Sequence, residues 1–260
     1  MAARSHCVAR PPYVRTRRGA FKLPRLATLC NGLLIRRWHL FQKGLYLTTA
    51  LILLLIWFGV GAAPNFDKML QLAKQRYGVA GTQNVQQWRA LLRDAQALSE
   101  AEKIKLVNGF FNRRIAFRED AEIWGTADYW ATPLETLGQG GGDCEDFTIA
   151  KYVTLKLLDV PIERMRLIYV RAQIGGPHSG ISQAHMVLGY YATPGAEPLV
   201  LDNLITDIRP ASRRTDLFPV FSFNSEGLWV GQAAGSSADP SARLSRWRDV
   251  ITRMQAEGLE

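Results

Sequence analysis

GGGDCEDFTIAKYVTLKLLDVP, residues 140–161, is the stretch on which the expected fold depends. Its three glycines predict a flexible loop that can turn sharply. Apolar residues then recur at helical spacing until Pro161, which cannot continue a helix. We therefore expect Cys144 in the first turn of a helix that directly follows a glycine loop.

Upstream of this stretch the sequence predicts helices only. Residues 66–77 and 85–95 carry apolar side chains at helical spacing. The segments 99–102 and 132–135 both have the Ser/Thr-x-x-Glu pattern of a capping box, which marks a helix start. Gly138 is a natural stop for the short helix that the second box begins.

Downstream of Pro161 the pattern changes to alternating apolar and polar residues, which predicts β-strands. The predicted strands are 165–172, 184–191, 199–201, 218–223 and 228–230. A last amphipathic helix covers residues 244–254. Because helices precede strands instead of alternating with them, the expected class is α+β, with a helical layer followed by an antiparallel sheet.

The net charge of +9 is concentrated at the N-terminus, where residues 1–44 hold ten Lys or Arg and no Asp or Glu. An apolar run at 45–60 and the small residues 61–63 follow. This order predicts a secretory signal, or an uncleaved membrane anchor if the run spans the bilayer. We expect a leader at 1–63, an exported single domain at 64–260, and no nucleic-acid partner.

Cysteine usage singles out one thiol. Cys7 and Cys30 lie in the predicted leader, so the exported part keeps only Cys144 and cannot form an internal disulfide. The N-terminus of a helix stabilises a thiolate, and glycines allow backbone N–H groups to approach a carbonyl. Cys144 is therefore a candidate nucleophile, the alternative being a structural cysteine in a core helix.

A thiol nucleophile needs a base that a carboxylate orients. His178 lies in a glycine-rich turn, which holds a base poorly, whereas His185 lies near the start of a predicted buried strand. Asp202 follows the next predicted strand and would lie near His185 if the two strands are neighbours. The alternatives are a core histidine and a turn-forming aspartate.

Three carboxylates flank the candidate nucleophile: Asp143, Glu145 and Asp146. Negative charge so close disfavours a thiolate. The acids could simply complement the helix dipole. They could instead bind an oxygen-seeking cation such as calcium, which would offset their charge.

Several separated segments resemble the LapG family of periplasmic bacterial transglutaminase-like cysteine proteases. They are YWATPLE (129–135), residues 140–161, QAHMVLGYY (183–191) and EPLVLDN (197–203), and the likeness runs from about Phe66 to 230. The resemblance implies a papain-like, transglutaminase-like core and a Cys144–His185–Asp202 triad. It also implies that Asp143, Glu145 and Asp146 bind calcium.

Enzymes of this family cut the N-terminal region of a large surface adhesin at paired alanines, release it from the outer membrane and promote biofilm dispersal. A LapD-type inner-membrane receptor for cyclic-di-GMP inhibits them. The resemblance thus implies a calcium-dependent periplasmic endopeptidase, although this leader is longer and more basic than is usual. Two alternatives stay open: an acyl transferase with the same triad, and a non-catalytic calcium-binding module.

Overall fold

The computed structural model describes residues 63–260, apart from residues 177, 194, 232–235, 237 and 260. The predicted secretory signal or membrane anchor at 1–63 therefore lies outside the described residues, save its last position. No helix in the described part of the chain is both long and apolar enough to cross a membrane.

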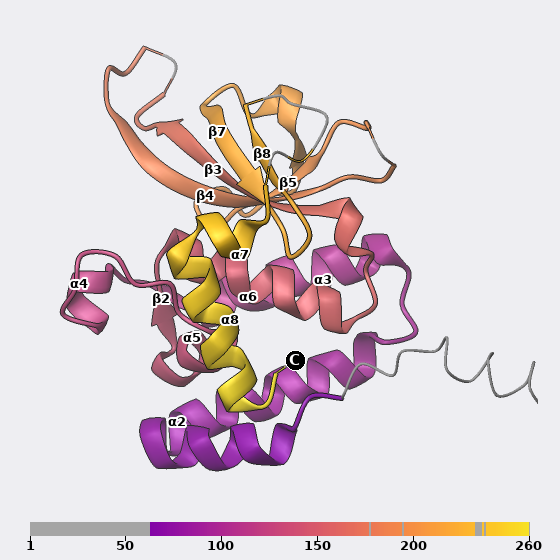
Figure 1. Ribbon diagram of the computed structural model, residues 1–260, viewed down its shortest axis with the longest axis vertical. Helices are drawn as coiled ribbons and strands as arrows, with labels where there is room; N and C mark the ends of the chain where they lie inside the picture. Colours follow the sequence, from indigo (N-terminus) through magenta and orange to yellow (C-terminus); the bar gives the residue numbers. More distant parts are fainter. Residues whose placement is uncertain (1–62, 177, 194, 232–235, 237, 260) are drawn as a thin grey trace, which may run out of the picture. The chain divides into compact units, whose positions relative to one another are not determined.

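The first half of the described chain is helical, and its helices pack together on one side of a sheet (Figure 1). The described helices are α2 (Phe66–Ala95), α3 (Glu100–Arg114), α4 (Asp120–Ile123), α5 (Pro133–Gln139), α6 (Cys144–Leu157), α7 (Pro240–Arg243) and α8 (Ser245–Glu257).

The capping boxes begin the helices that the sequence predicts. Ser99 caps α3 in a reciprocal box with Glu102, and Thr132 caps α5 with Glu135 in the same way. The two predicted helices at 66–77 and 85–95 run together as α2, which is kinked at Gly78, where φ is 67° and ψ is −152°. Each box satisfies backbone N–H groups that would otherwise have no partner at the helix start.

The glycines before Cys144 do not form the flexible loop that the sequence predicts. Helix α5 continues past Gly138, and Gly140 ends it in a left-handed conformation with φ of 62°. Gly141–Gly142 then form the buried strand β2, which pairs in parallel with β1 (Ala116–Phe117). Strand β1, which lies upstream of α5, supplies hydrogen-bond partners for the backbone of Gly141–Gly142. The two glycines therefore have a fixed backbone conformation directly before α6.

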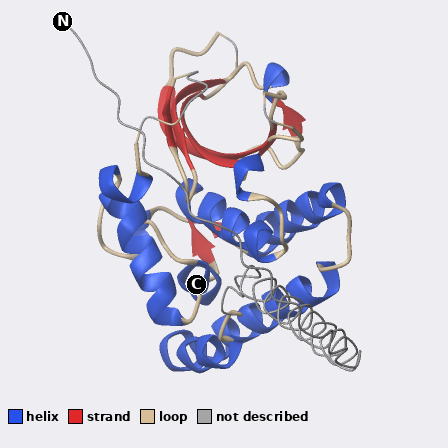
Figure 2. Cartoon of the chain, turned by 45° about the vertical axis from the view of Figure 1, so that its right-hand side comes forward, coloured by secondary structure: helices blue, strands red, loops and turns tan. Residues whose placement is uncertain are grey.

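The second half forms a six-stranded antiparallel sheet in the order β6-β5-β4-β3-β7-β8, which curls into an open ring when seen along its strands (Figure 2). Its strands are β3 (Met165–Gln173), β4 (Ser182–Tyr190), β5 (Leu199–Leu201), β6 (Arg209–Pro210), β7 (Leu217–Phe223) and β8 (Leu228–Val230). The helices followed by this sheet confirm the predicted α+β class.

The main core lies between the helices and the sheet, with α6 at its centre. Nearly all of α6 from Asp146 onward is buried. Its Tyr152 ring packs against Trp247 of α8, with ring centroids 6.0 Å apart, and Trp247 packs against Phe223 of β7 at 5.3 Å. Burying large apolar side chains of this kind contributes about 1.5–3 kcal/mol each, so α6 is held firmly between both layers.

The approach of α2 to α5 leaves no room for a side chain at Gly138. A Cβ added there would lie 2.1 Å from the Tyr77 ring. We predict that Gly138→Ala lowers the free energy of unfolding by about 1–3 kcal/mol, because the Tyr77 ring or the helices must move. Urea unfolding would measure this, with Gly180→Ala as the control, since a Cβ at Gly180 meets nothing within 4 Å. Equal midpoints for the two variants would contradict the tight packing.

Candidate active site

Cys144 is the first residue of α6, as the sequence predicts. The residue before it, Asp143, donates its backbone N–H to Oδ2 of Asp146 at 3.4 Å, which closes the first turn of the helix. At this position Cys144 lies at the positive end of the helix dipole, where backbone N–H groups lack helical partners.

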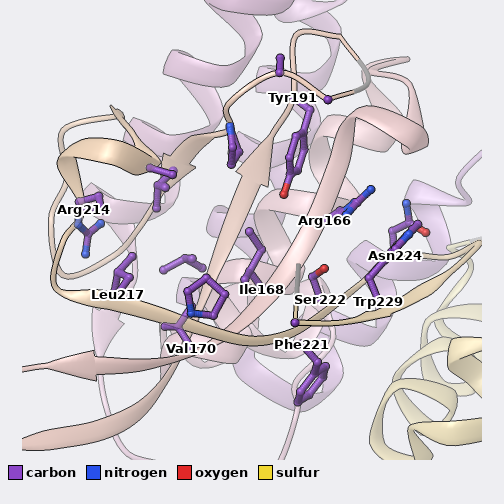
Figure 3. A pocket seen from close by; sticks show the side chains of 18 of the residues that line it. Arg166, Ile168, Val170, Tyr191, Arg214, Leu217, Phe221, Ser222, Asn224 and Trp229 are labelled. Atoms are coloured by element: carbon purple, nitrogen blue, oxygen red, sulfur yellow. The ribbon is translucent and has the colours of Figure 1, made fainter. Parts of the chain in front are cut away.

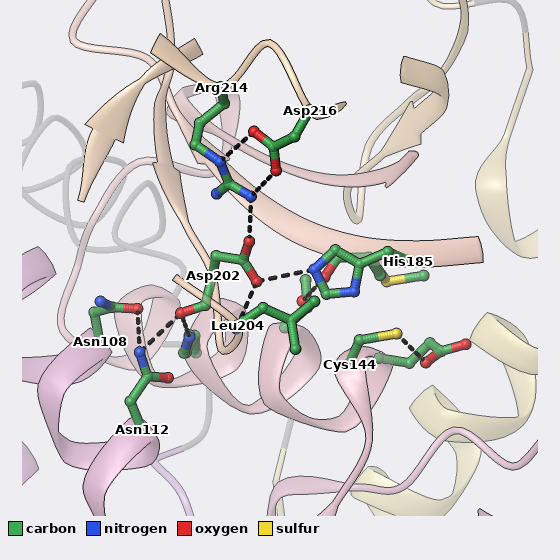
Figure 4. Close-up of polar contacts among 12 residues, drawn as sticks. Asn108, Asn112, Cys144, His185, Asp202, Leu204, Arg214 and Asp216 are labelled. Atoms are coloured by element: carbon green, nitrogen blue, oxygen red, sulfur yellow. Dashed lines mark hydrogen bonds and ion pairs between the residues drawn. The ribbon is translucent and has the colours of Figure 1, made fainter. Parts of the chain in front are cut away.

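His185 and Asp202 come together across neighbouring strands. Strand β4 pairs with β5 so that Leu188 lies opposite Leu201, and Asp202 directly follows β5. His185 Nε2 lies 2.9 Å from Asp202 Oδ1, and both side chains are buried (Figure 4). The sequence predicts that these two residues lie close together if their strands are neighbours, and β4 and β5 are paired neighbours.

The Asp202 carboxylate has a complete set of partners. Its Oδ1 also accepts the backbone N–H of Leu204 at 3.0 Å, and its Oδ2 accepts from Arg214 Nη2 at 2.7 Å. Burial alone would raise its pKa, but His185, Leu204 and Arg214 together hold the pKa of Asp202 at about 2. Asp202 is therefore a stable carboxylate at any ordinary pH.

The Cys144 thiol lies beside the strand that carries His185. Thr148 of α6 donates to the backbone oxygen of Met186 at 3.0 Å, which ties the helix to β4. The thiol also contacts the backbone N–H of Met186, the residue after His185. Figure 4 shows the thiol and the imidazole on facing elements. His178, the other described histidine, is exposed in a turn.

The thiol donates its hydrogen bond to Glu145, with Sγ 2.7 Å from Oε2, and no bond to His185 is present among the described contacts. Burial and the neighbouring carboxylates of Glu145 and Asp143 raise the pKa of the Cys144 thiol. The Met186 N–H acts in the opposite direction but does not outweigh them. Burial is thus the largest obstacle to a thiolate, and these acids add to it.

A cluster of carboxylates lies under the start of α6. Oxygens of Asp120, Asp143 and Asp146 lie within 4.8 Å of one another, while Glu145 groups with Asp143 and Cys144 instead. The three acids that the sequence grouped together thus fall in two overlapping groups that share Asp143, and Glu145 stays a predicted ligand. The structure adds Asp120 of α4, which sequence reasoning missed, because no motif links this short helix to Cys144.

The cluster fits a hard divalent cation such as calcium. Asp120 Oδ1 and Asp143 Oδ1 are buried and have no hydrogen-bond partner among the described residues. Burial raises the pKa of Asp120, Asp143 and Asp146 alike, because each buried carboxylate lacks enough positive charge nearby. Oxygen ligands that lack partners and carry excess negative charge are what calcium requires.

Residues 81–230 match the family model for bacterial transglutaminase-like cysteine proteinases. This chain belongs to that family. The EGTA-treated structure of Legionella pneumophila LapG is similar to it, with 37% sequence identity and a TM-score of 0.64 over 74% of this chain and 100% of that one. Calcium-bound Legionella pneumophila LapG has 39% identity and a TM-score of 0.62 over 73% and 98%. A search of curated proteins gave no match.

These likenesses confirm the resemblance that the sequence motifs indicate, and with it a transglutaminase-like fold in a family of cysteine proteases. The LapG structure has been solved both with calcium and after treatment with a chelator. The roles of Cys144, His185 and Asp202, and the set of cation ligands, stay predictions that rest on the geometry above.

The buried acids predict an unusual dependence of stability on pH. A carboxylate whose folded pKa is raised contributes stability that is present at low pH and lost as the pH rises through that pKa. With a chelator present, lowering the pH from about 8 to about 5.5 should therefore raise the melting temperature, by about 2–4 °C for each kcal/mol gained. Glu257, whose burial raises its pKa to about 7, acts in the same direction. The lowered pKa of Asp202 acts in the opposite direction, but its contribution to stability is lost only as the pH falls below about 5.

Differential scanning fluorimetry across this pH range would measure the effect. Asp120→Asn should flatten the dependence, and Glu257→Gln separates the contribution of the distant Glu257. A melting temperature that drops steadily as the pH is lowered from about 8 to about 5.5, in both the unmodified chain and the Glu257 variant, would contradict the assignment of raised pKa values to the cluster.

Proposed function

We propose that this chain is a calcium-dependent cysteine endopeptidase in which Cys144 is the nucleophile, His185 the base and Asp202 the residue that orients the base. One observation carries the proposal: the single described thiol begins α6 beside the strand whose buried imidazole is bonded to a charged carboxylate. Membership of a cysteine proteinase family supports it.

The chemistry follows from the positions of the atoms. Because Nε2 of His185 is engaged by Asp202, its Nδ1 is the nitrogen that takes the thiol proton. The Cys144 sulfur then forms a bond to the peptide carbonyl carbon, and backbone N–H groups at the start of α6 stabilise the oxyanion. His185 passes the proton to the departing amine, and water hydrolyses the thioester to a new carboxylate.

The acidic cluster explains a dependence on calcium. Calcium bound by Asp120, Asp143 and Asp146 would supply positive charge beside the thiol. That charge would offset the carboxylates that now raise the pKa of Cys144. Glu145 accepts a hydrogen bond from the Cys144 thiol. With calcium bound, Glu145 would compete less with His185 for the thiol proton.

We further propose that the substrate is the N-terminal region of a large surface adhesin, cut in the periplasm to release it from the outer membrane. A LapD-type cyclic-di-GMP receptor of the inner membrane would inhibit the enzyme. The likeness to Legionella pneumophila LapG supports this assignment, as does the basic, then apolar, leader in the sequence. Release of the adhesin would promote biofilm dispersal.

Replacing the nucleophile tests the chemistry directly. Cys144→Ala should abolish cleavage of a recombinant adhesin N-terminal fragment containing paired alanines, taken from the organism that makes this chain. The melting temperature should stay close to that of the unmodified chain, because a half-buried thiol is lost without a large cavity. Gel electrophoresis and mass spectrometry would follow the products. A new carboxylate indicates hydrolysis, an isopeptide indicates acyl transfer, and retained cleavage rules out the assignment.

Chelation tests the cation. The unmodified chain should lose cleavage in EGTA and regain it with added calcium, whereas Asp120→Asn should need at least about tenfold more calcium, since each carboxylate ligand adds to affinity. Asp67→Asn, on an exposed side chain of α2, is the matched control. Calorimetric titration would report binding independently of activity. Equal cleavage in EGTA and in calcium would contradict the proposed dependence of the enzyme on calcium.

A further inference from the structure

Arg214 is a charged residue buried at the back of the His185–Asp202 pair. It lies between the 3-10 turn η2 (Ala211–Arg213) and β7, and its side chain is only 2% exposed. A buried guanidinium is costly unless carboxylates satisfy it. Here Nη2 donates to Asp202 Oδ2 at 2.7 Å, so the cation meets the acid that holds the imidazole.

A second carboxylate fixes the orientation of the guanidinium. Asp216 accepts from Arg214 Nε at 3.0 Å and from Nη2 at 2.7 Å, a two-point contact that sets the plane of the fork. With its plane set, Nη2 reaches Asp202 from one fixed direction. As a result, the two carboxylate oxygens of Asp202 have different partners: Oδ2 faces Arg214 and Oδ1 faces His185 (Figure 4).

We propose that Arg214 is the positioning residue of the catalytic pair: it turns the Asp202 carboxylate so that Oδ1 points at His185. This inference rests on the proposed function. Without Arg214 the Asp202 carboxylate keeps the backbone N–H of Leu204 and the imidazole, but nothing bonded to Oδ2 prevents its rotation. Arg214 thus acts through Asp202 and never touches the substrate.

Arg214 also lines a large cavity inside the curled sheet, about 990 Å³ in volume (Figure 3). Val187 and Val200 line it too, and alternation along β4 and β5 places them on the same face of the sheet as His185 and Asp202. Arg214 Nη1 has no hydrogen-bond partner among the described residues. Removing the side chain would therefore open the back of Asp202 to this cavity, through which a small cation can enter.

Four charged or titratable groups face Asp202 or its partner. They are His185 of β4, Arg214, Asp216 bonded to Arg214, and Lys151 of α6, whose Nζ donates to the Asp202 backbone oxygen at 3.1 Å. Loss of Arg214 removes a cation and leaves two acids behind. The pKa of Asp202 should rise, and the acid limb of the pH profile should move to higher pH.

The test is chemical rescue of Arg214→Met in the full exported domain. We expect kcat to fall about 10- to 100-fold with KM little changed, since the variant alters orientation and leaves substrate contacts intact. Guanidinium chloride at low millimolar concentration should restore at least several-fold of kcat, while sodium chloride at equal ionic strength should not. Arg166→Met is the control, because Arg166 lines the same cavity but lies over the Trp229 ring, 3.9 Å from its centroid.

Two further variants keep the test decisive if Arg214→Met does not fold. Arg214→Lys can meet one acid but cannot form the fork, so it should fold and show a reduced kcat with a displaced acid limb. Asp216→Asn, on a side chain that is 33% exposed, should lower kcat more mildly by freeing the plane of the guanidinium.

Unchanged kcat and pH profiles in both Arg214→Lys and Asp216→Asn would overturn the positioning role. So would a reduced kcat in Arg214→Met that guanidinium does not restore, because that result indicates a structural loss only. An unmodified chain that cleaves nothing defeats the proposed function, whatever these variants do.

Discussion

The position of α6 is the constraint on which the rest of the site depends. The helix is buried between the other helices and the curled sheet, so it cannot shift without opening both contacts. Its start is fixed from one side by the short β1–β2 pair and from the other by the bond from Thr148 to β4. Cys144 is therefore presented by a rigid element at a defined position beside β4, as the proposed role of nucleophile requires.

The buried aspartates near Cys144 and His185 differ in the direction of their pKa shifts, because different groups surround them. Asp202 is buried with Arg214, His185 and a backbone N–H around it, and its pKa is held at about 2. Asp143 and Asp146 are buried mainly among other acids, and their pKa values are raised. The protein itself supplies the positive charge that balances Asp202. Around Asp143 and Asp146 it supplies oxygen atoms but leaves the compensating positive charge to come from elsewhere, as at a cation site.

Much of this arrangement can be read from the sequence because its signals are local. Capping boxes, helical spacing and alternation predict the elements, and the lone thiol after the glycines predicts a helix-start cysteine. Asp120, Arg214 and the β1–β2 pair escape such reasoning for one physical reason. Each acts through a contact with a residue on another element of the fold, and no motif near it in the sequence indicates that contact. The pair of His185 and Asp202 was within reach only because two consecutive strands of an antiparallel sheet are usually neighbours.

In the proposed mechanism, the His185–Asp202 pair already has the arrangement that catalysis needs, whereas the Cys144 thiol does not. The imidazole and its carboxylate are already bonded and need no rearrangement. The thiol, by contrast, is bonded to Glu145 and surrounded by negative charge. Burial and the acids at the start of α6 both raise the pKa of the thiol, and of these two causes the charge of the acids is the one that a bound cation can offset. Control of the nucleophile therefore lies with whatever neutralises those acids, and the same short turn of helix that presents Cys144 also determines when it can react.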